Sequence, residues 1–459
     1  GSAPDRIVLE TNVEEKPTGE LSLSAGFSSI ENFILQASVR QRNFRGKGQQ
    51  LSASVNYSSY SKSLELGFTE PYLFDRNISI GGSVFRRDLN SFNFVGDRRE
   101  TTFEQVTTGF QLNVGVPLTE FLSAFGRYSL SFDDVTLDRN IYFFGNQCDP
   151  LVAGRYLCDA IGKRTTSLLG LTLAYDDRDN RIRPTRGQSV SLSADFAGLG
   201  GSVKYGRAVL RSSKHFRLPA GFILTTALEG GYIQPFGSAP FPGSDKVRLT
   251  DRFFLGEPQI RGFDIRGVGP RVVRFGQVDL TNPLNPVLNT DERARIDDAL
   301  GGRAYYQGRV EIDIPLGSGA KELGLRPSIF LDVGSVFKVK TPTLTTLANF
   351  RDPADGRTKF LCRNAATGAT EFGTQALTTP PGGTPTPSGD YNQCRTGFSA
   401  LAPFEERFFG DTWKPRMSVG AGVNWNSPFG PFRIDFAYAL LKEEGDDTKK
   451  FSFNVGTQF

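Results

Sequence analysis

The stretch QIRGFDIRGVGPR (259–271) concentrates arginine and glycine around a single phenylalanine. Its Arg261 carries a planar guanidinium group that can bind a carboxylate through two parallel hydrogen bonds. Two later segments supply acceptors: GRVEIDIP contains Glu311 and Asp313, and IFLDVGSVF contains Asp332. We expect Arg261 to pin its loop against a neighbouring wall through such a carboxylate. The alternative is an arginine that meets water or the carbonyl groups of its own loop.

Residues suited to catalysis or cofactor binding are scarce. His215 is the single histidine, so no Ser/His/Asp arrangement can be built elsewhere, and an ordinary strand-end residue is the simpler interpretation. YDDRDNR (175–181) imitates a calcium loop, but its spacing does not match acidic metal loops. GLGGSVKYG (198–206) lacks the following helix that a phosphate site needs. The net charge of +4 is scattered, which argues against nucleic-acid binding. The sequence predicts no enzyme, metal or cofactor.

The four cysteines form two pairs that are local in sequence, Cys148 with Cys158 and Cys362 with Cys394. Three pairings are possible on paper, and loop geometry favours the local ones. Neither pair has the spacing of metal ligands, so the alternative to disulfides is four free thiols. Two local disulfides would indicate an oxidising compartment outside the cytoplasm.

The elements that must position these residues have the period of β-strands. In LSLSAGF, Leu21, Leu23, Ala25 and Phe27 fall on one face and small or polar residues on the other. We count about 16 such segments, an even number typical of outer-membrane barrels, and find no apolar run long enough for a membrane helix. The polar face carries a set of charges that suits a wet lumen better than the dry core of a soluble β-sandwich: Arg40, Arg127, Arg309, Glu311, Arg433 and Asp435. The fold prediction is therefore all-β, a 16-stranded antiparallel transmembrane β-barrel.

Connection lengths add an orientation to this barrel. Short turns at 44–48, 116–120, 218–221 and 427–431 alternate with long connections at about 135–165, 237–302 and 340–413, as outer-membrane barrels alternate periplasmic turns with extracellular loops. Both cysteine pairs then lie in outer loops. The long loop at 237–302 carries several apolar side chains whose exposure to water would be unfavourable, so we expect the loop to insert into the lumen. These residues are Phe253, Phe254, Leu255, Ile260 and Phe263.

The two ends of the chain suggest a barrel that follows another domain. FSFNVGTQF (451–459) alternates to a terminal aromatic residue, as expected of a last strand that ends in an aromatic girdle. At the other end, residues 1–18 are interpreted as a cloning remnant, Gly1-Ser2, followed by the end of a preceding periplasmic domain. Residues 19–459 are expected to form the barrel.

These motifs together resemble the BamA family of outer-membrane assembly barrels. The resemblance covers nearly the whole chain and includes FTEPYLFDRN (68–77), RDNRIRPTRGQ (178–188), FFLGEPQIRGFDIRGVGP (253–270) and LDVGSVF (331–337). It implies a barrel that inserts and folds other β-barrels into the outer membrane of Gram-negative bacteria, preceded by periplasmic repeat (POTRA) domains. The implied partners are nascent barrel proteins, outer-membrane lipid and the accessory lipoproteins of the assembly complex, which bind mainly through the periplasmic domains.

The resemblance also assigns roles to individual residues. In the loop motif Ile260-Arg261-Gly262-Phe263, the arginine is expected to contact Glu311 and Asp332, and Gly456 is expected to mark a bend at the seam between the first and last strands. The insertion TTPPGGTPTPSGDYNQC (378–394) departs from the family pattern.

A mechanism without an active site follows from the seam. The first strand is expected to pair with the last, where Gly456 weakens the ladder. If this lateral gate opens, an incoming strand can add to the first strand by β-augmentation. The expected seam residues are Leu21, Leu23, Ala25, Phe27, Phe451, Phe453, Val455, Gly456 and Phe459. The alternatives are a relative that works in autotransporter assembly or two-partner secretion, and a passive porin with an open lumen.

Overall fold

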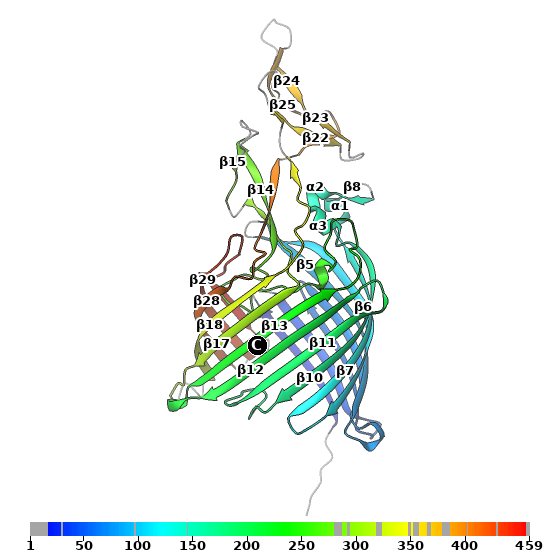
Figure 1. Ribbon diagram of the computed structural model, residues 1–459, viewed down its shortest axis with the longest axis vertical. Helices are drawn as coiled ribbons and strands as arrows, with labels where there is room; N and C mark the ends of the chain where they lie inside the picture. Colours follow the sequence, from blue (N-terminus) through cyan, green and yellow to red (C-terminus); the bar gives the residue numbers. More distant parts are fainter. Residues whose placement is uncertain are drawn as a thin grey trace, which may run out of the picture.

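The structure is a computed structural model (Figure 1). It describes residues 17–28, 31–95, 98–144, 146–279, 287–291, 294–317, 324–347, 350–351, 358–364, 369–378, 386–401, 403–427 and 430–455. Residues 1–16, which the sequence assigns to a preceding domain, and Gly456 to Phe459 lie outside these ranges. The predicted division of the chain at residue 18 therefore remains a prediction.

The dominant element is a closed antiparallel β-barrel of 16 strands, which confirms the fold class predicted from the sequence. Every strand pairs with its predecessor in the ring, and the last strand pairs with the first. The ring consists of β1 (Gly19–Ser28), β2 (Asn32–Phe44), β3 (Gln49–Ser58), β4 (Ser61–Glu70), β5 (Ser79–Val95), β6 (Arg98–Pro117), β7 (Leu122–Thr136), β10 (Gly162–Asp176), β11 (Gly187–Gly201), β12 (Tyr205–Arg217), β13 (Ile223–Pro235), β17 (Ala304–Asp313), β18 (Leu325–Phe337), β28 (Arg416–Ser427), β29 (Gly430–Leu441) and β30 (Phe451–Val455).

The two faces of the barrel wall differ as period two requires. On β10, Leu169, Leu171 and Leu173 alternate to the outside and are exposed there. The inner face is charged, and Asp195 of β11 pairs with Arg127 and Arg207 at 2.7 Å each. An apolar exterior around a polar interior is the arrangement that lipid outside and water inside stabilise. Within the described residues, no helix is long and apolar enough to cross a membrane.

The three longest connections all lie at one rim of the barrel, here called the long-loop rim, and the other is called the short-turn rim (Figure 1). The short-turn rim includes two 3-10 turns, η1 (Leu73–Asp75) and η2 (Pro219–Gly221). The long-loop rim carries three structured connections. The first contains α1 (Arg139–Tyr142), β8 (Phe143–Phe144), β9 (Gln147–Cys148), α2 (Pro150–Ala153) and α3 (Arg155–Cys158). The second, residues 236–303 and here called the lumen loop, contains η3 (Leu249–Asp251), β14 (Arg271–Asp279), β15 (Val287–Leu288) and β16 (Ile296–Ala299).

The third long connection, between β18 and β28, contains many short strands. They are β19 (Thr346–Leu347), β20 (Phe350–Arg351), β21 (Thr358–Lys359), β22 (Leu361–Asn364), β23 (Thr370–Phe372), β24 (Thr374–Thr378), β25 (Thr386–Gln393), β26 (Phe398–Ala400) and β27 (Phe404–Phe409). Strand β27 pairs with β14 of the lumen loop, and β16 of the lumen loop pairs with the end of β5. The long loops are therefore tied to one another and to the barrel wall above the lumen.

Both local disulfides are formed, Cys148–Cys158 and Cys362–Cys394, as the sequence predicts. The first bond closes a small loop around α2 and α3. Ala153 and Leu157 of these helices are buried in one cluster with Leu249 and Leu300 of the lumen loop. The disulfide thus holds two short helices, too short to be stable alone, against the lumen loop.

Replacing Cys148 and Cys158 together by serine should loosen this connection and leave the barrel closed. The bond joins residues with a sequence separation of 10, and disulfides commonly stabilise by about 2–4 kcal/mol. We expect limited proteolysis to cut within residues 139–161 faster than in the parent protein, while the barrel keeps its compact migration on unheated gels. Equal resistance of this connection in both proteins would show that packing alone holds it.

Candidate functional site: the lumen loop and the strand seam

The lumen loop brings the IRGF motif to the inner wall of the barrel. A cavity of about 910 Å³ is lined by Glu257, Gln259 and Arg261 of this loop together with residues of β11, β12, β13, β17, β29 and β30. The apolar members Ile260 and Phe263 are fully buried in a cluster with Leu255, Val268 and Val336. Phe253 is partly buried and packs against this cluster. The apolar residues in and around the motif are therefore shielded from water by the wall and by the loop itself.

Gly262 makes the turn of the motif possible. Its φ of +88° lies in the left-handed region, which side chains with a Cβ rarely adopt. A Cβ added at Gly262 would lie 3.0 Å from the Cβ of Ser418 and 3.3 Å from that of Ala437. The turn therefore requires glycine for its backbone angle and for its close approach to β28 and β29.

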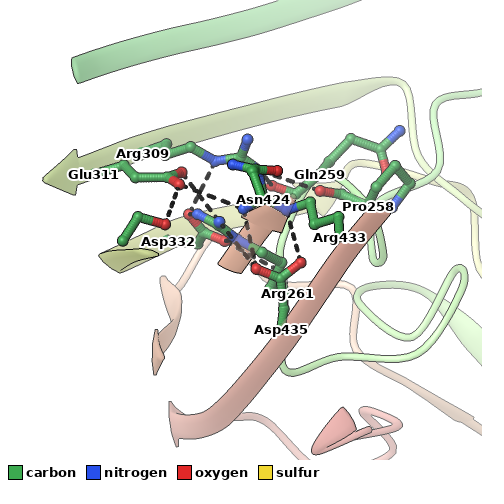
Figure 2. A network of polar contacts seen from close by, with 10 residues as sticks. Pro258, Gln259, Arg261, Arg309, Glu311, Asp332, Asn424, Arg433 and Asp435 are labelled. Carbon is green, nitrogen blue, oxygen red and sulfur yellow. Dashed lines mark hydrogen bonds and ion pairs between the residues drawn. The ribbon is translucent and has the colours of Figure 1, made fainter. Parts of the chain in front are cut away.

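Arg261 is buried and bound to two carboxylates on adjacent strands (Figure 2). Its Nε donates to Asp332 Oδ2 at 2.8 Å, its Nη2 to Asp332 Oδ1 at 2.9 Å, and its Nη1 to Glu311 Oε2 at 3.0 Å. The backbone N–H of Arg261 also donates to Asp332, at 3.1 Å. The guanidinium lies 3.3 Å from the centroid of the Phe330 ring. The structure thus brings together the arginine and the two acids that the sequence names.

Two further arginines complete the cluster around these acids (Figure 2). Arg309 donates to Asp332 Oδ1 at 3.1 Å and to the carbonyl groups of Pro258 and Gln259, at 3.1 Å each. Arg433 donates to Asp435 at 2.7 Å and to Glu311 at 3.4 Å. Arg261 and Asp435 also form an ion pair at 3.7 Å. The cluster therefore contains three arginines and three carboxylates, so its charges balance.

The sequence placed Arg309, Arg433 and Asp435 on the inner face without joining them to Arg261. Strand register is the feature that could have joined them, because Arg309 on β17 lies directly opposite Asp332 on β18, the acid that Arg261 binds. Asp313, the third acid considered, lies at the end of β17, and the charged side chains that act on it are Glu311, Arg326 and Arg433.

The lumen loop has a second anchor, on strands β7 and β10. Asp251 of η3 accepts a hydrogen bond from Arg164 of β10 at 2.6 Å, and Arg164 lies 3.3 Å from Asp133 of β7. All three side chains are largely buried. Because β11, β12 and β13 separate β10 from β17 in the ring, the loop is fastened to two separate parts of the wall.

The acidic turn at 177–187 and His215, the other candidates for a metal or catalytic site, make hydrogen bonds within the protein. In the turn at 177–187, Asp179 accepts from the backbone of Thr185 at 2.8 Å and Asp177 accepts from the backbone of Gln188 at 2.5 Å. These acids therefore stabilise their own turn. His215 Nδ1 lies 3.0 Å from Thr225 Oγ1 on the neighbouring strand. Over the part of the chain that the structure describes, no group of three or more His, Cys, Asp or Glu side chains is arranged to hold a metal ion.

The seam between β1 and β30 is short in the described residues. It consists of two residue pairs, Phe27 with Val455 and Ser28 with Asn454, whereas β1 and β2 share ten. Leu21, Leu23 and Ala25 are exposed on β1, and they have no partner on β30 up to Val455. Phe451 and Phe453 pack on β29, at ring distances of 5.1 Å from Phe436 and 6.3 Å from Phe432. Gly456 and Phe459, the remaining seam residues named from the sequence, lie outside the described residues.

Replacing Arg261 by methionine should destabilise the barrel strongly. Asp332 is fully buried and would lose the two hydrogen bonds that the Arg261 side chain donates, while the backbone N–H of residue 261 remains as a donor. Removing one partner of a buried ion pair costs about 3–5 kcal/mol. We expect the urea concentration at the unfolding midpoint to fall accordingly. The matched control is Arg211→Met, because the Arg211–Glu229 pair is half-exposed and such a pair contributes about 1 kcal/mol or less. Equal effects of the two substitutions would contradict the central role of Arg261.

Comparisons with known proteins agree with this architecture. Outer membrane protein assembly factor BamA of Neorickettsia risticii is 26% identical over 99% of this chain and 47% of its own length. The corresponding protein of Neisseria meningitidis serogroup B is 24% identical over 99% of this chain and 49% of its own length. The chain thus spans about half the length of the curated relatives it matches.

A solved structure shares the fold. The crystal structure of BamA from Haemophilus ducreyi lacking POTRA domains 1–3 superposes with a TM-score of 0.65 at 19% identity, covering 97% of this chain and 71% of that one. The family model of the Omp85 superfamily domain matches residues 43–459, most of the barrel from the end of β2 onward. The chain described here belongs to the Omp85 superfamily.

Proposed function

We propose that this chain inserts and folds β-barrel proteins into the bacterial outer membrane, through a lateral gate between β1 and β30. The barrel resides in that membrane, and the relatives at 24% and 26% identity bear the name of outer membrane protein assembly factors. The observation that supports the proposal is the seam: among the residues that the structure describes, two residue pairs join β1 to β30, against ten between β1 and β2.

The physical basis is the cost of an unpaired backbone in lipid. Each N–H or C=O group without a partner in the hydrocarbon region costs several kcal/mol. The edge of β1 from Gly19 to Gly26 has no partner on β30 up to Val455, so a strand that adds there gains hydrogen bonds for both chains. The folding client supplies the free energy through its own pairing and burial, and no nucleotide is needed.

The proposed partners follow from this role. They are nascent outer-membrane barrel proteins at the seam, lipid around the apolar exterior, and accessory lipoproteins that bind mainly to periplasmic domains. In this arrangement the short-turn rim faces the periplasm and the long-loop rim, with both disulfides, faces the outside, where disulfides persist.

A passive porin is the main alternative. Such a protein needs an open lumen, whereas here the lumen loop is fastened to β10 by Asp251 and to β17 and β18 by Arg261. In planar bilayers we therefore propose conductance well below that of an open barrel. Steady large conductance would favour the porin. A role in autotransporter assembly or two-partner secretion would be separated by which substrates the chain handles.

Locking the seam tests the gate. Ser28 and Asn454 are paired in register and both are buried, and the structure records no free cysteine in the described part of the chain. In the full-length protein, Ser28→Cys combined with Asn454→Cys should form a disulfide under oxidation and stop the insertion of a client barrel, because β1 and β30 can no longer part.

The single variants Ser28→Cys and Asn454→Cys, oxidised in the same way, are the matched controls and should remain active. Mild reduction of the locked protein should restore insertion. Full activity of a completely cross-linked barrel would refute lateral opening at this seam.

A further inference from the structure

The connection between β29 and β30, residues 442–450, forms a backbone ladder with the lumen loop. The N–H of Asp264 donates to the carbonyl of Asp447 at 3.0 Å, and the N–H of Asp447 donates to the carbonyl of Gly267 at 2.8 Å. Lys449 donates from its N–H to the carbonyl of Gly262 at 3.2 Å, and Phe263 and Thr448 form a β-bridge. The IRGF motif is thus bonded to residues that immediately precede the seam strand, which starts at Phe451.

One buried ion pair fixes this connection in place. Asp446 Oδ2 accepts from Arg416 Nε at 2.9 Å and from the N–H of Glu443 at 2.8 Å, while its Oδ1 accepts from the N–H of Gly269 in the lumen loop at 3.3 Å. The side chains of Arg416 and Asp446 are both fully buried. Asp446 therefore joins the lumen loop, the start of β28 and the approach to β30 through a single carboxylate.

Arg416 uses its remaining donors on the backbone of the preceding segment. It donates to the carbonyl groups of Gly410 at 3.0 Å, Thr412 at 2.9 Å and Lys414 at 3.2 Å, and to Ser335 Oγ at 2.9 Å. A fully buried charge of this kind is costly unless its partner is present. This arrangement makes Asp446 the single counter-charge in direct contact with Arg416 among the ion pairs of the described residues.

In the Arg416–Asp446 pair, Asp446 lies close in sequence to β30, the last strand of the seam. Strand β30 shares five residue pairs with β29 but two with β1 in the described residues. Its loop-side end is continuous with the connection that Asp446 and the IRGF ladder hold. The position of β30 relative to β1 therefore depends on the lumen loop, through Asp446 and residues 447–449.

We propose that the Arg416–Asp446 pair is a latch that holds the loop-side end of β30 on the lumen loop and so sets how β30 meets β1. Arg416 and Asp446 are positioning residues for the seam, and they act separately from the Arg261 cluster on β17 and β18. This inference deepens the proposed function and rests on it where client insertion is concerned. The state of the seam itself can be measured without any client.

The test measures cross-linking between Ser28→Cys and Asn454→Cys in the full-length protein reconstituted in phosphatidylcholine vesicles. Adding Asp446→Asn removes the charge that neutralises Arg416 and should lower the ratio of cross-linked to free barrel about tenfold, within the usual range of coupling between sites. The matched control is Asp447→Asn. Asp447 contacts the lumen loop through its backbone N–H and carbonyl group, which asparagine keeps.

Compact migration on unheated gels shows which variants have folded. If Asp446→Asn fails to fold, Arg416→Lys replaces it, because lysine keeps the positive charge but cannot reach all the acceptors of the guanidinium; an intermediate loss of cross-linking is then expected. Cross-linking that stays at the parent level in a folded Asp446→Asn or Arg416→Lys protein overturns the latch, as does an equal loss in Asp447→Asn. If the parent inserts no client barrel, the proposed function fails, while the cross-linking ratio still decides the latch.

Discussion

A backbone in hydrocarbon has no water to bind, so every N–H and C=O group must find a partner within the protein. This constraint closes the sheet into a ring, because an open sheet would leave two unpaired edges in lipid. It also makes any weak place in the ring significant. The proposed weak place in this barrel is between β1 and β30, where the described residues form two residue pairs, against the ten that β1 makes with β2.

The wet interior imposes a different constraint, which the lumen loop meets. The inner faces of β17, β18 and β29 carry Glu311, Asp332 and Asp435, which would repel one another if left alone. Arg261 reaches these acids from the loop, and Arg309 and Arg433 reach them from the wall. Because the loop supplies one of the three cations, the charges of the acids are neutralised only when the loop is bound to the wall. The buried apolar cluster around Ile260 and Phe263 holds the loop at the same place.

Much of this architecture could be predicted from the sequence because it depends on local patterns. Strict alternation such as that of Leu21, Leu23 and Ala25 fixes strands and their faces, and the short spacing of Cys148 and Cys158 favours a local disulfide. Contacts between distant segments were harder. Arg261 could be matched with acids of the inner face because it lacked a local partner. Arg416 and Asp446 are separated by a whole hairpin, and nothing in their spacing reveals that both are fully buried. The residues after Val455 lie outside the described structure, so the bend expected at Gly456 remains a prediction.

The unequal pairing on the two sides of β30 determines what an exchange at the seam would cost. In the part of the seam that the structure describes, parting β1 from β30 breaks two residue pairs, while β30 keeps five with β29. Strand β1 pairs along all ten of its residues with β2, so its other edge can offer a guest strand a ladder of the same length. In the proposed mechanism, a guest strand that pairs with this edge of β1 gains hydrogen bonds, and each is worth more in lipid than in water because no solvent competes for it. The proposed exchange therefore needs no external energy source, provided that β30 stays attached to β29 while it leaves β1.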